Sequence, residues 1–201
     1  MNYRKLFSAH KIIRDLSLVQ FIAYFGAWFS NVAIYTMLVD FGSSEMAISV
    51  VTAMHFLPAI LIAPFSGAII DRVKIKPLMI TLLATELLMT ILFLTIDNKD
   101  DLWLLMILIF VRMSAASMFF STEMSLLAKL LRGKPLQMAN EIHSIIWSFT
   151  YAAGMAVSGF VVNWYGVKTA FMIDAVIFAI ALIVFIRIDF VVKASEATDN
   201  F

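Results

Sequence analysis

The sequence predicts an all-α membrane protein whose six transmembrane helices form two inverted three-helix repeats. Hydrophobic residues make up 62% of the 201 residues and charged residues only 14%, whereas soluble domains contain about half and about a quarter. Six apolar runs are long enough to cross a bilayer, because a spanning helix needs about 20 residues. A short sequence also recurs in the second and fifth runs, which favours a repeated unit.

The six runs are predicted to be helices because backbone groups cannot remain unpaired in lipid. The first run is too long for the apolar core of a signal peptide and has no small-residue cleavage site, so it belongs to the predicted bundle. We expect a basic cytoplasmic segment at 1–15, the bundle at 16–188 and a polar cytoplasmic tail at 189–201. The predicted helices are Leu16–Val39, Met46–Ile70, Pro77–Ile96, Leu102–Thr122, Ile142–Val162 and Val167–Ile186.

Basic residues gather on one side of the predicted bundle. They are concentrated in the N-terminal segment, the links after the second and fourth helices, and the C-terminal end. Because cytoplasmic loops carry an excess of Lys and Arg, both termini are expected in the cytoplasm of a cell membrane. The net charge of +1 gives no reason to expect a nucleic-acid partner. The chain has no cysteine, so disulfides and thiolate sites are excluded, and no metal or other cofactor is predicted.

The first predicted helix has a stripe of polar and aromatic residues on one face. Successive members are four, four, three and four residues apart, which is helical spacing. Polar atoms in lipid face the bundle interior or water. The stripe therefore either lines a substrate cavity or makes hydrogen bonds between helices, and Asn31 is its deepest member. The stripe consists of Gln20, Tyr24, Trp28, Asn31 and Tyr35.

The second predicted helix contains His55 together with Pro58 and Pro64. Each proline removes a backbone donor and tends to kink the helix. His55 can change its charge near neutral pH, so it is a candidate proton-responsive group. The alternative is that His55 only donates a hydrogen bond to a neighbouring helix.

Three further ionisable residues are predicted to lie inside the membrane. Glu86 and Arg112 fall near the midplane, because each is about ten residues from one end of its helix. They either form an ion pair with each other, or Arg112 faces a wet central cavity. Asp174, in the sixth helix, is either a proton carrier or a hydrogen-bonded packing group.

The fifth predicted helix carries small residues that favour close helix packing, namely Gly154, Ser158 and Gly159. The segment Ser158–Asn163 also resembles Ser66–Asp71, which ends the second helix. Each segment ends the second helix of a three-helix unit. Since three is odd, the two units cross the membrane in opposite directions. Inverted repeats are typical of secondary transporters.

The link between the second and third helices resembles motif A of the major facilitator superfamily. The residues that carry this resemblance are Gly67, Asp71, Arg72, Lys74 and Lys76. Other segments resemble the enterobactin-exporter-like and drug-efflux branch of that superfamily. They are Leu57–Pro58, Pro64, Leu136–Asn140 and Ala170–Asp174. The resemblance implies that the chain is the N-terminal six-helix half of a twelve-helix fold.

The resemblance also implies roles for single residues. Gly67 would let the second helix pack closely on the other half, and Asp71 with Arg72 would latch the outward-facing state. Arg112 would be linked to proton coupling. The Gly154–Gly159 segment would correspond to an antiporter motif, although Met155 replaces its proline and Ser158 one of its paired glycines. Ala27 replaces an acid that the branch often carries.

The predicted function is proton-coupled efflux of small organic molecules, such as drugs or siderophores, by alternating access. The expected partners are the lipid bilayer, a small-molecule substrate, and a second six-helix half or another copy of the chain. One alternative is a truncated or split half that does not transport alone. A small channel and an intramembrane enzyme are further alternatives. No enzyme activity is expected, because the sequence lacks Gly-x-Ser-x-Gly and His-Glu-x-x-His motifs.

Overall fold

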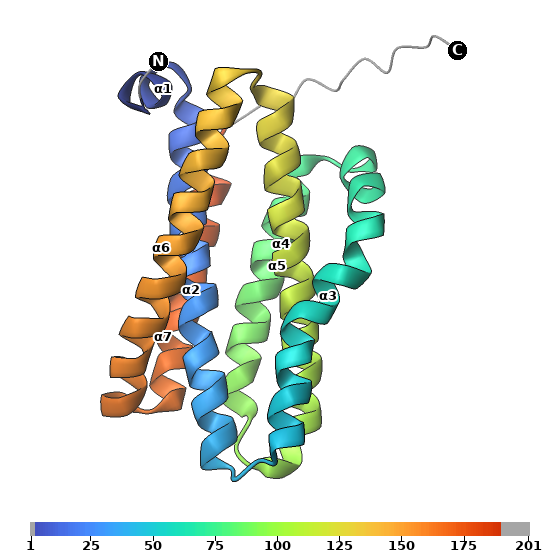
Figure 1. Ribbon diagram of the computed structural model, residues 1–201, viewed down its shortest axis with the longest axis vertical. Coiled ribbons are helices and arrows are strands. Elements are labelled where there is room, and N and C mark those ends of the chain that lie inside the picture. The colour runs from blue at the N-terminus through green and yellow to red at the C-terminus, as the bar shows by residue number, and fades with distance from the viewer. Residues whose placement is uncertain (1–2, 190–201) are drawn as a thin grey trace.

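The computed structural model describes residues 3–189, and these form an up-and-down bundle of long helices (Figure 1). Six of the helices are long and apolar enough to cross a membrane, so the predicted number of spans is confirmed. Because the helices alternate in direction, α2–α4 and α5–α7 cross in opposite senses. The elements are α1 Tyr3–Ala9, α2 Lys11–Asp40, α3 Glu45–Arg72, α4 Ile75–Leu92, the 3-10 turns η1 Phe93–Thr95 and η2 Lys99–Asp101, α5 Leu102–Leu130, α6 Lys134–Tyr165 and α7 Val167–Ile186.

Four of the six long helices, α2, α3, α5 and α6, extend beyond the apolar runs from which they were predicted, whereas α7 has the predicted bounds and α4 ends before Ile96. Helix α5 continues to Leu130, and α6 begins at Lys134 rather than at Ile142. The break between them is Gly133, whose φ of 57° is easily adopted only by glycine. Apolar runs show where a helix meets lipid, whereas the helix itself ends where the backbone changes direction.

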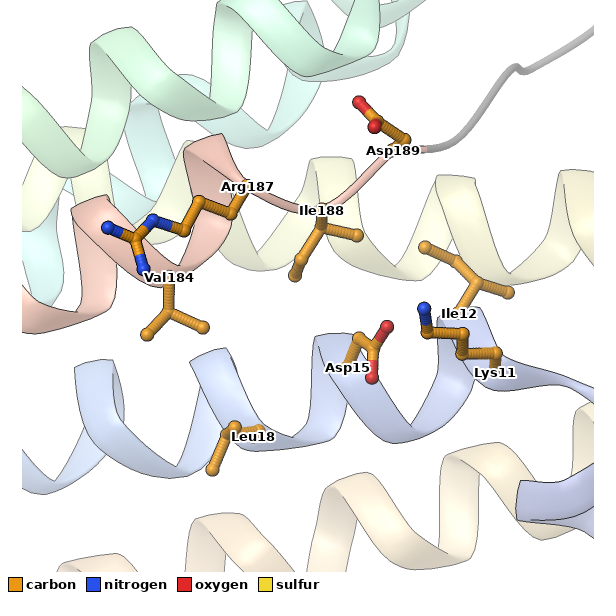
Figure 2. Close-up of a pocket in the computed structure, with 8 residues that line it drawn as sticks. All are labelled: Lys11, Ile12, Asp15, Leu18, Val184, Arg187, Ile188 and Asp189. Atoms are coloured by element: carbon orange, nitrogen blue, oxygen red, sulfur yellow. The ribbon is translucent and has the colours of Figure 1, made fainter.

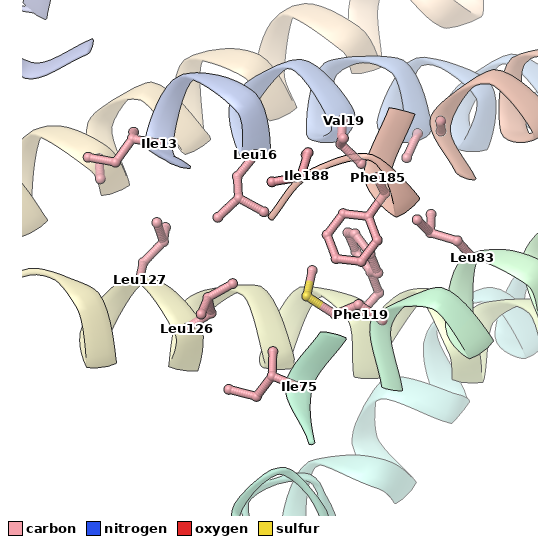
Figure 3. Packing of buried hydrophobic residues seen from close by; sticks show 14 of the residues in the cluster. Ile13, Leu16, Val19, Ile75, Leu83, Phe119, Leu126, Leu127, Phe185 and Ile188 are labelled. Atoms are coloured by element: carbon pink, nitrogen blue, oxygen red, sulfur yellow. The ribbon is translucent and has the colours of Figure 1, made fainter. Parts of the chain in front are cut away.

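Helix α2 lies at the centre of the packing. It contacts α6 and α7, while α4 contacts α5 and α7, and α3 contacts α5. Two hydrophobic clusters hold this arrangement together, one toward the end that carries the N-terminus and one toward the opposite end. The first cluster includes Leu16, Leu83, Phe119 and Phe185 (Figure 3).

Helix α3 is the least buried of the six long helices. It contains Pro58 and Pro64, and Figure 1 shows that it bends in its middle. Its first half packs along α5, whereas its second half is largely exposed, with Ile60 and Phe65 69% and 65% exposed. An exposed apolar face over half of a helix is normal where the helix lies in lipid or contacts another helix bundle.

Candidate functional site

A buried ion pair between Arg112 of α5 and Asp174 of α7 lies inside the bundle. Arg112 Nη2 donates to Asp174 Oδ2 over 2.8 Å, and the side chains are 4% and 0% exposed. The guanidinium carbon also lies 5.5 Å and 5.1 Å from the ring centres of Phe93 and Phe178. A cation held between an acid and two aromatic faces is compensated in a place where water cannot reach it.

The expected ion pair between Glu86 and Arg112 is wrong. Among residues 3–189, Glu86 forms no ion pair. It is nevertheless buried, at 4% exposed, and close enough to Arg112 for the two charges to attract each other. The alternative of an Arg112 side chain in a wet cavity is also wrong, because that side chain is buried. Depth in the membrane placed Glu86 and Arg112 at one level, but the rotation of α7 brings Asp174 to the guanidinium.

Four helices meet at Asp174. Its Oδ2 accepts from Ser30 of α2 and, over 3.5 Å, from Thr90 of α4, in addition to Arg112. Gly26 of α2 permits this approach, since a Cβ there would lie 2.6 Å from Asp174 Oδ1. We call Ser30, Thr90, Arg112 and Asp174 the central cluster. The hydrogen-bonded alternative for Asp174 agrees with this geometry, and a proton-carrying role stays a prediction.

His55 is held by contacts on both sides of its ring. Its Nδ1 lies 3.0 Å from the carbonyl oxygen of Val51, and its Nε2 lies 2.9 Å from Oδ1 of Asn31. The Tyr35 ring stacks on the imidazole with 5.7 Å between centres. A protonated ring donates to both oxygens, whereas a neutral ring needs the NH₂ group of Asn31 to face Nε2. His55 therefore bridges α2 and α3 in either charge state.

A second group of buried polar residues lies closer to the end of the bundle that carries the N-terminus. Tyr24 donates from its hydroxyl to Glu123 Oε2 over 3.2 Å, and His143 Nδ1 lies 3.8 Å from the same oxygen. The Gln20 amide nitrogen contacts His143 Nδ1. We call Gln20, Tyr24, Glu123 and His143 the second cluster, and it joins α2, α5 and α6.

Sequence reasoning did not select Glu123 as a site residue. It directly follows Thr122, where the apolar run of the fourth predicted helix ends, so it was placed outside the membrane span. In the structure α5 continues past it, and its side chain is 2% exposed. The available signal was helical spacing, because Glu123 lies eleven residues, or three turns, after Arg112.

The polar stripe of α2 makes contacts between helices along its whole length. Gln20 and Tyr24 belong to the second cluster, Asn31 contacts His55, and the Tyr35 hydroxyl donates to Thr52 over 3.2 Å. The Trp28 ring packs edge-on against Trp147 and Tyr151 of α6, at 5.5 Å and 4.6 Å. These contacts agree with the interhelical alternative, and contact with a substrate stays a prediction.

The small residues of α6 differ in what they contact. A Cβ at Gly154 would lie 3.0 Å from the Phe25 carbonyl oxygen, so Gly154 sits at a close contact with α2. Ser158 is fully buried, and its hydroxyl has no hydrogen-bond partner among residues 3–189. A Cβ at Gly159 would meet nothing within 4 Å. Only Gly154 and Ser158 therefore pack inside the described bundle.

The residues that resemble motif A lie at the exposed end of α3 and the start of α4. Asp71 pairs with Lys129 at the end of α5 over 3.1 Å, and Lys76 pairs with Asp189 over 3.4 Å. Arg72 and Lys74 are exposed and form no ion pair with any residue from 3 to 189. Gly67 has nothing within 4 Å of its Cβ position, so no helix of the described bundle uses the close approach that it permits.

A surface pocket of about 310 Å³ opens between α2 and the end of α7 (Figure 2). Four of its lining side chains are charged and four are apolar. None of the sequence-predicted site residues lines it. The lining residues are Lys11, Ile12, Asp15, Leu18, Val184, Arg187, Ile188 and Asp189.

Two comparisons with known proteins bear on this geometry. The model of the Major Facilitator Superfamily matches residues 16–199. The chain is also 26% identical over 182 residues to YfiS, an uncharacterized MFS-type transporter of Bacillus subtilis (strain 168). The alignment covers 90% of this chain and 43% of the relative, so the chain spans less than half of the relative's length.

Proposed function

Since the chain belongs to the major facilitator superfamily, we propose that it is one six-helix half of a proton-coupled exporter of small organic molecules. Membership makes it a membrane-embedded protein of a transporter family. Proton coupling, export, and substrates such as drugs or siderophores are the proposed part. The proposed location is the cell membrane, with both termini in the cytoplasm as the basic residues favour.

The observation that carries the proposal is the ion pair between Arg112 and Asp174. A charged acid inside a membrane costs free energy, and the acids that are retained there often have a function such as carrying protons. Protonating Asp174 would cancel its charge and leave Arg112 uncompensated. Because the central cluster joins α2, α4, α5 and α7, this single change would favour a different packing of four helices. Such a link between one proton and helix packing is what alternating access needs.

The proposal that the chain is one half of a carrier is supported by faces of the bundle that no residue from 3 to 189 covers. The close approach that Gly67 permits is unused within residues 3–189, and the second half of α3 is largely exposed. A second six-helix bundle seated against α3 would use both features. The alignment with 43% of the Bacillus relative agrees with a partner of similar size.

The proposed substrate class follows from the aromatic side chains at the surface of α6. Trp147 and Tyr151 are each 42% exposed and stack at 5.8 Å beside Trp28. Flat, apolar organic molecules bind well to such surfaces. In an assembled carrier this group would form one wall of the substrate path.

The test uses sealed vesicles with an imposed pH gradient. The purified chain is reconstituted alone and together with the part of the Bacillus relative that lies beyond the alignment. We expect gradient-driven transport of a fluorescent organic dye such as ethidium only with both halves, and its loss in Asp174→Asn. Transport by the chain alone would contradict the half character. Transport that ignores the gradient would contradict proton coupling.

A further inference from the structure

The second cluster holds an acid and a histidine that the central cluster does not use. Glu123 on α5 and His143 on α6 are 2% and 7% exposed at their side chains. Glu123 Oε2 lies 3.8 Å from His143 Nδ1, which is close enough for an ion pair but longer than a hydrogen bond. Both helices are membrane spans, so a change of charge here takes place without bulk water.

Within the described residues, no permanent cation forms an ion pair with Glu123. Asp174, by contrast, has Arg112. The titratable groups that face it are Tyr24 from α2 and His143 from α6. Glu86 of α4 interacts electrostatically with Tyr24. No titratable group of α3 or α7 in the described chain contacts Glu123. The charge of Glu123 therefore depends on its own proton and on that of His143.

Counting charges shows which state of the pair suits an apolar interior. With one proton, the pair is neutral overall, either as Glu–COOH beside a neutral imidazole or as carboxylate beside imidazolium. With no proton it carries one uncompensated negative charge, which burial strongly disfavours. With two protons it carries one positive charge, which is disfavoured for the same reason. A single bound proton is the state that the surroundings stabilise.

The two hydrogen bonds around the pair leave room for that proton. The Tyr24 hydroxyl donates a hydrogen bond to Glu123 Oε2, and a carboxylate oxygen can accept it. The NH₂ group of Gln20 faces His143 Nδ1, so this nitrogen accepts in the neutral ring and Nε2 carries the hydrogen. Nε2 is buried and has no partner among residues 3–189. One side of the imidazole thus retains unused hydrogen-bonding capacity.

We propose that Glu123 and His143 form a proton-binding site in which the two side chains share one exchangeable proton. On uptake, a hydronium ion gives its proton to the anionic pair, so that one O–H or N–H bond forms and water leaves. If the proton resides on His143 Nδ1, this nitrogen changes from acceptor to donor, and the Gln20 amide must turn its oxygen toward the ring. In that case, loading the site changes a contact between α2 and α6.

This site would supply the proposed exporter with a second proton position at a different depth from Asp174. That use rests on the proposed function, whereas proton binding itself does not require transport. Proton binding and proton-coupled transport can therefore fail separately, and proton binding is measured on the chain alone.

The first measurement is infrared titration of the purified chain in lipid. A protonated buried carboxyl gives a C=O band that disappears when the proton leaves. We expect a pH-dependent band that is lost in Glu123→Gln, kept in Glu123→Asp, and shifted in its titration by His143→Gln. Glu86→Gln is the control, because Glu86 is also buried (4% exposed) but lies outside the pair. It should keep the band that Glu123→Gln removes.

The second measurement uses a chain in which the pair is unchanged. The protein has three histidines, and the variant His10→Gln/His55→Gln leaves only His143 for nitrogen NMR. We expect the His143 signals to move with pH over the same range as the infrared band. The proposal is overturned if neither the carboxyl band nor the His143 signals change with pH, or if Glu123→Gln leaves the band in place.

The outcomes also separate this site from the proposed function. If Glu123→Gln abolishes the band while the assembled carrier transports without a pH gradient, the proton site stands and proton coupling fails. If the carrier is driven by the gradient and the band survives Glu123→Gln, coupling stands and this site is wrong.

Discussion

The two buried polar clusters differ in how their acids are compensated. Asp174 faces a guanidinium that is always charged, with two further hydroxyl donors on the same oxygen. Glu123 faces a phenol and an imidazole, and only the imidazole can become positive near neutral pH. The first arrangement fixes the position of four helices. The second permits a change of charge with little rearrangement.

The largest expected effect is on the central cluster. Arg112→Leu leaves Asp174 buried without its cation, which costs about 3–5 kcal/mol when one partner of a buried pair is removed. We expect a large drop in the thermal unfolding temperature of the chain in detergent. The double variant Arg112→Leu/Asp174→Leu should recover much of it.

The control for this prediction is Arg72→Leu. Arg72 is exposed and has no ion pair among residues 3–189, so its loss should change stability little. A similar loss in Arg72→Leu and Arg112→Leu would show that the buried pair has no special role.

A smaller effect is expected where α6 crosses α2, because this contact positions the second cluster. In Gly154→Val, the new Cβ meets the Phe25 carbonyl oxygen at 3.0 Å and the Trp28 Cβ at 3.2 Å. Since the first of these is backbone, the helices must separate, at a cost of about 1–3 kcal/mol. Thermal unfolding measures it.

Gly159→Val makes the same replacement in the same helix, where nothing lies within 4 Å of the Cβ position. It should cost much less. Equal losses at the two positions would mean that helix propensity, rather than contact with α2, controls the result.

A still smaller effect is expected for Glu123→Gln. The amide keeps the shape of the side chain and can accept from Tyr24, so the loss should be under about 1 kcal/mol. Asp174→Asn, the same change in the central cluster, removes the charge that balances Arg112 and should cost several times more. Chemical unfolding of the two variants compares them directly, and a larger loss in Glu123→Gln would reverse the ranking of the clusters.

The smallest effect on stability is expected for an exposed acid, and comparison with the buried acids shows how much burial adds to the cost of losing an ion pair. Asp71 pairs with Lys129 over 3.1 Å, but the two side chains are 72% and 33% exposed. Asp71→Asn should cost at most about 1 kcal/mol, and the difference should shrink at high salt because salt screens exposed charges. Asp100→Asn, at an exposed acid that forms no ion pair among residues 3–189, is the control for salt itself. A loss that salt does not change would contradict the assignment of Asp71 as a surface pair.

The sequence was sufficient to predict the number and order of the spans. Lipid imposes a length on each helix, and apolar runs record that length directly. The helical spacing of the α2 stripe was also informative, since Gln20, Tyr24, Asn31 and Tyr35 all make polar contacts with other helices.

The partners within the clusters could not be predicted in the same way. Hydropathy gives the depth of Glu86, Arg112 and Asp174 but not the rotation of their helices, and rotation decides which acid meets the arginine. Glu123 was missed for a related reason, because an apolar run ends at the first charge even when the helix and its burial continue.

Because α3 bends at its middle, a small rotation of its second half produces a large displacement at the end of the helix. From Pro58 to Asp71 the helix is about 20 Å long at 1.5 Å per residue. If the prolines serve as the pivot, a change of only about 10° moves Asp71 by about 3.5 Å at that radius. That displacement is slightly larger than the 3.1 Å length of its contact with Lys129. A small angular motion in the middle of the membrane is thus amplified at its surface, where it makes or breaks an ionic contact.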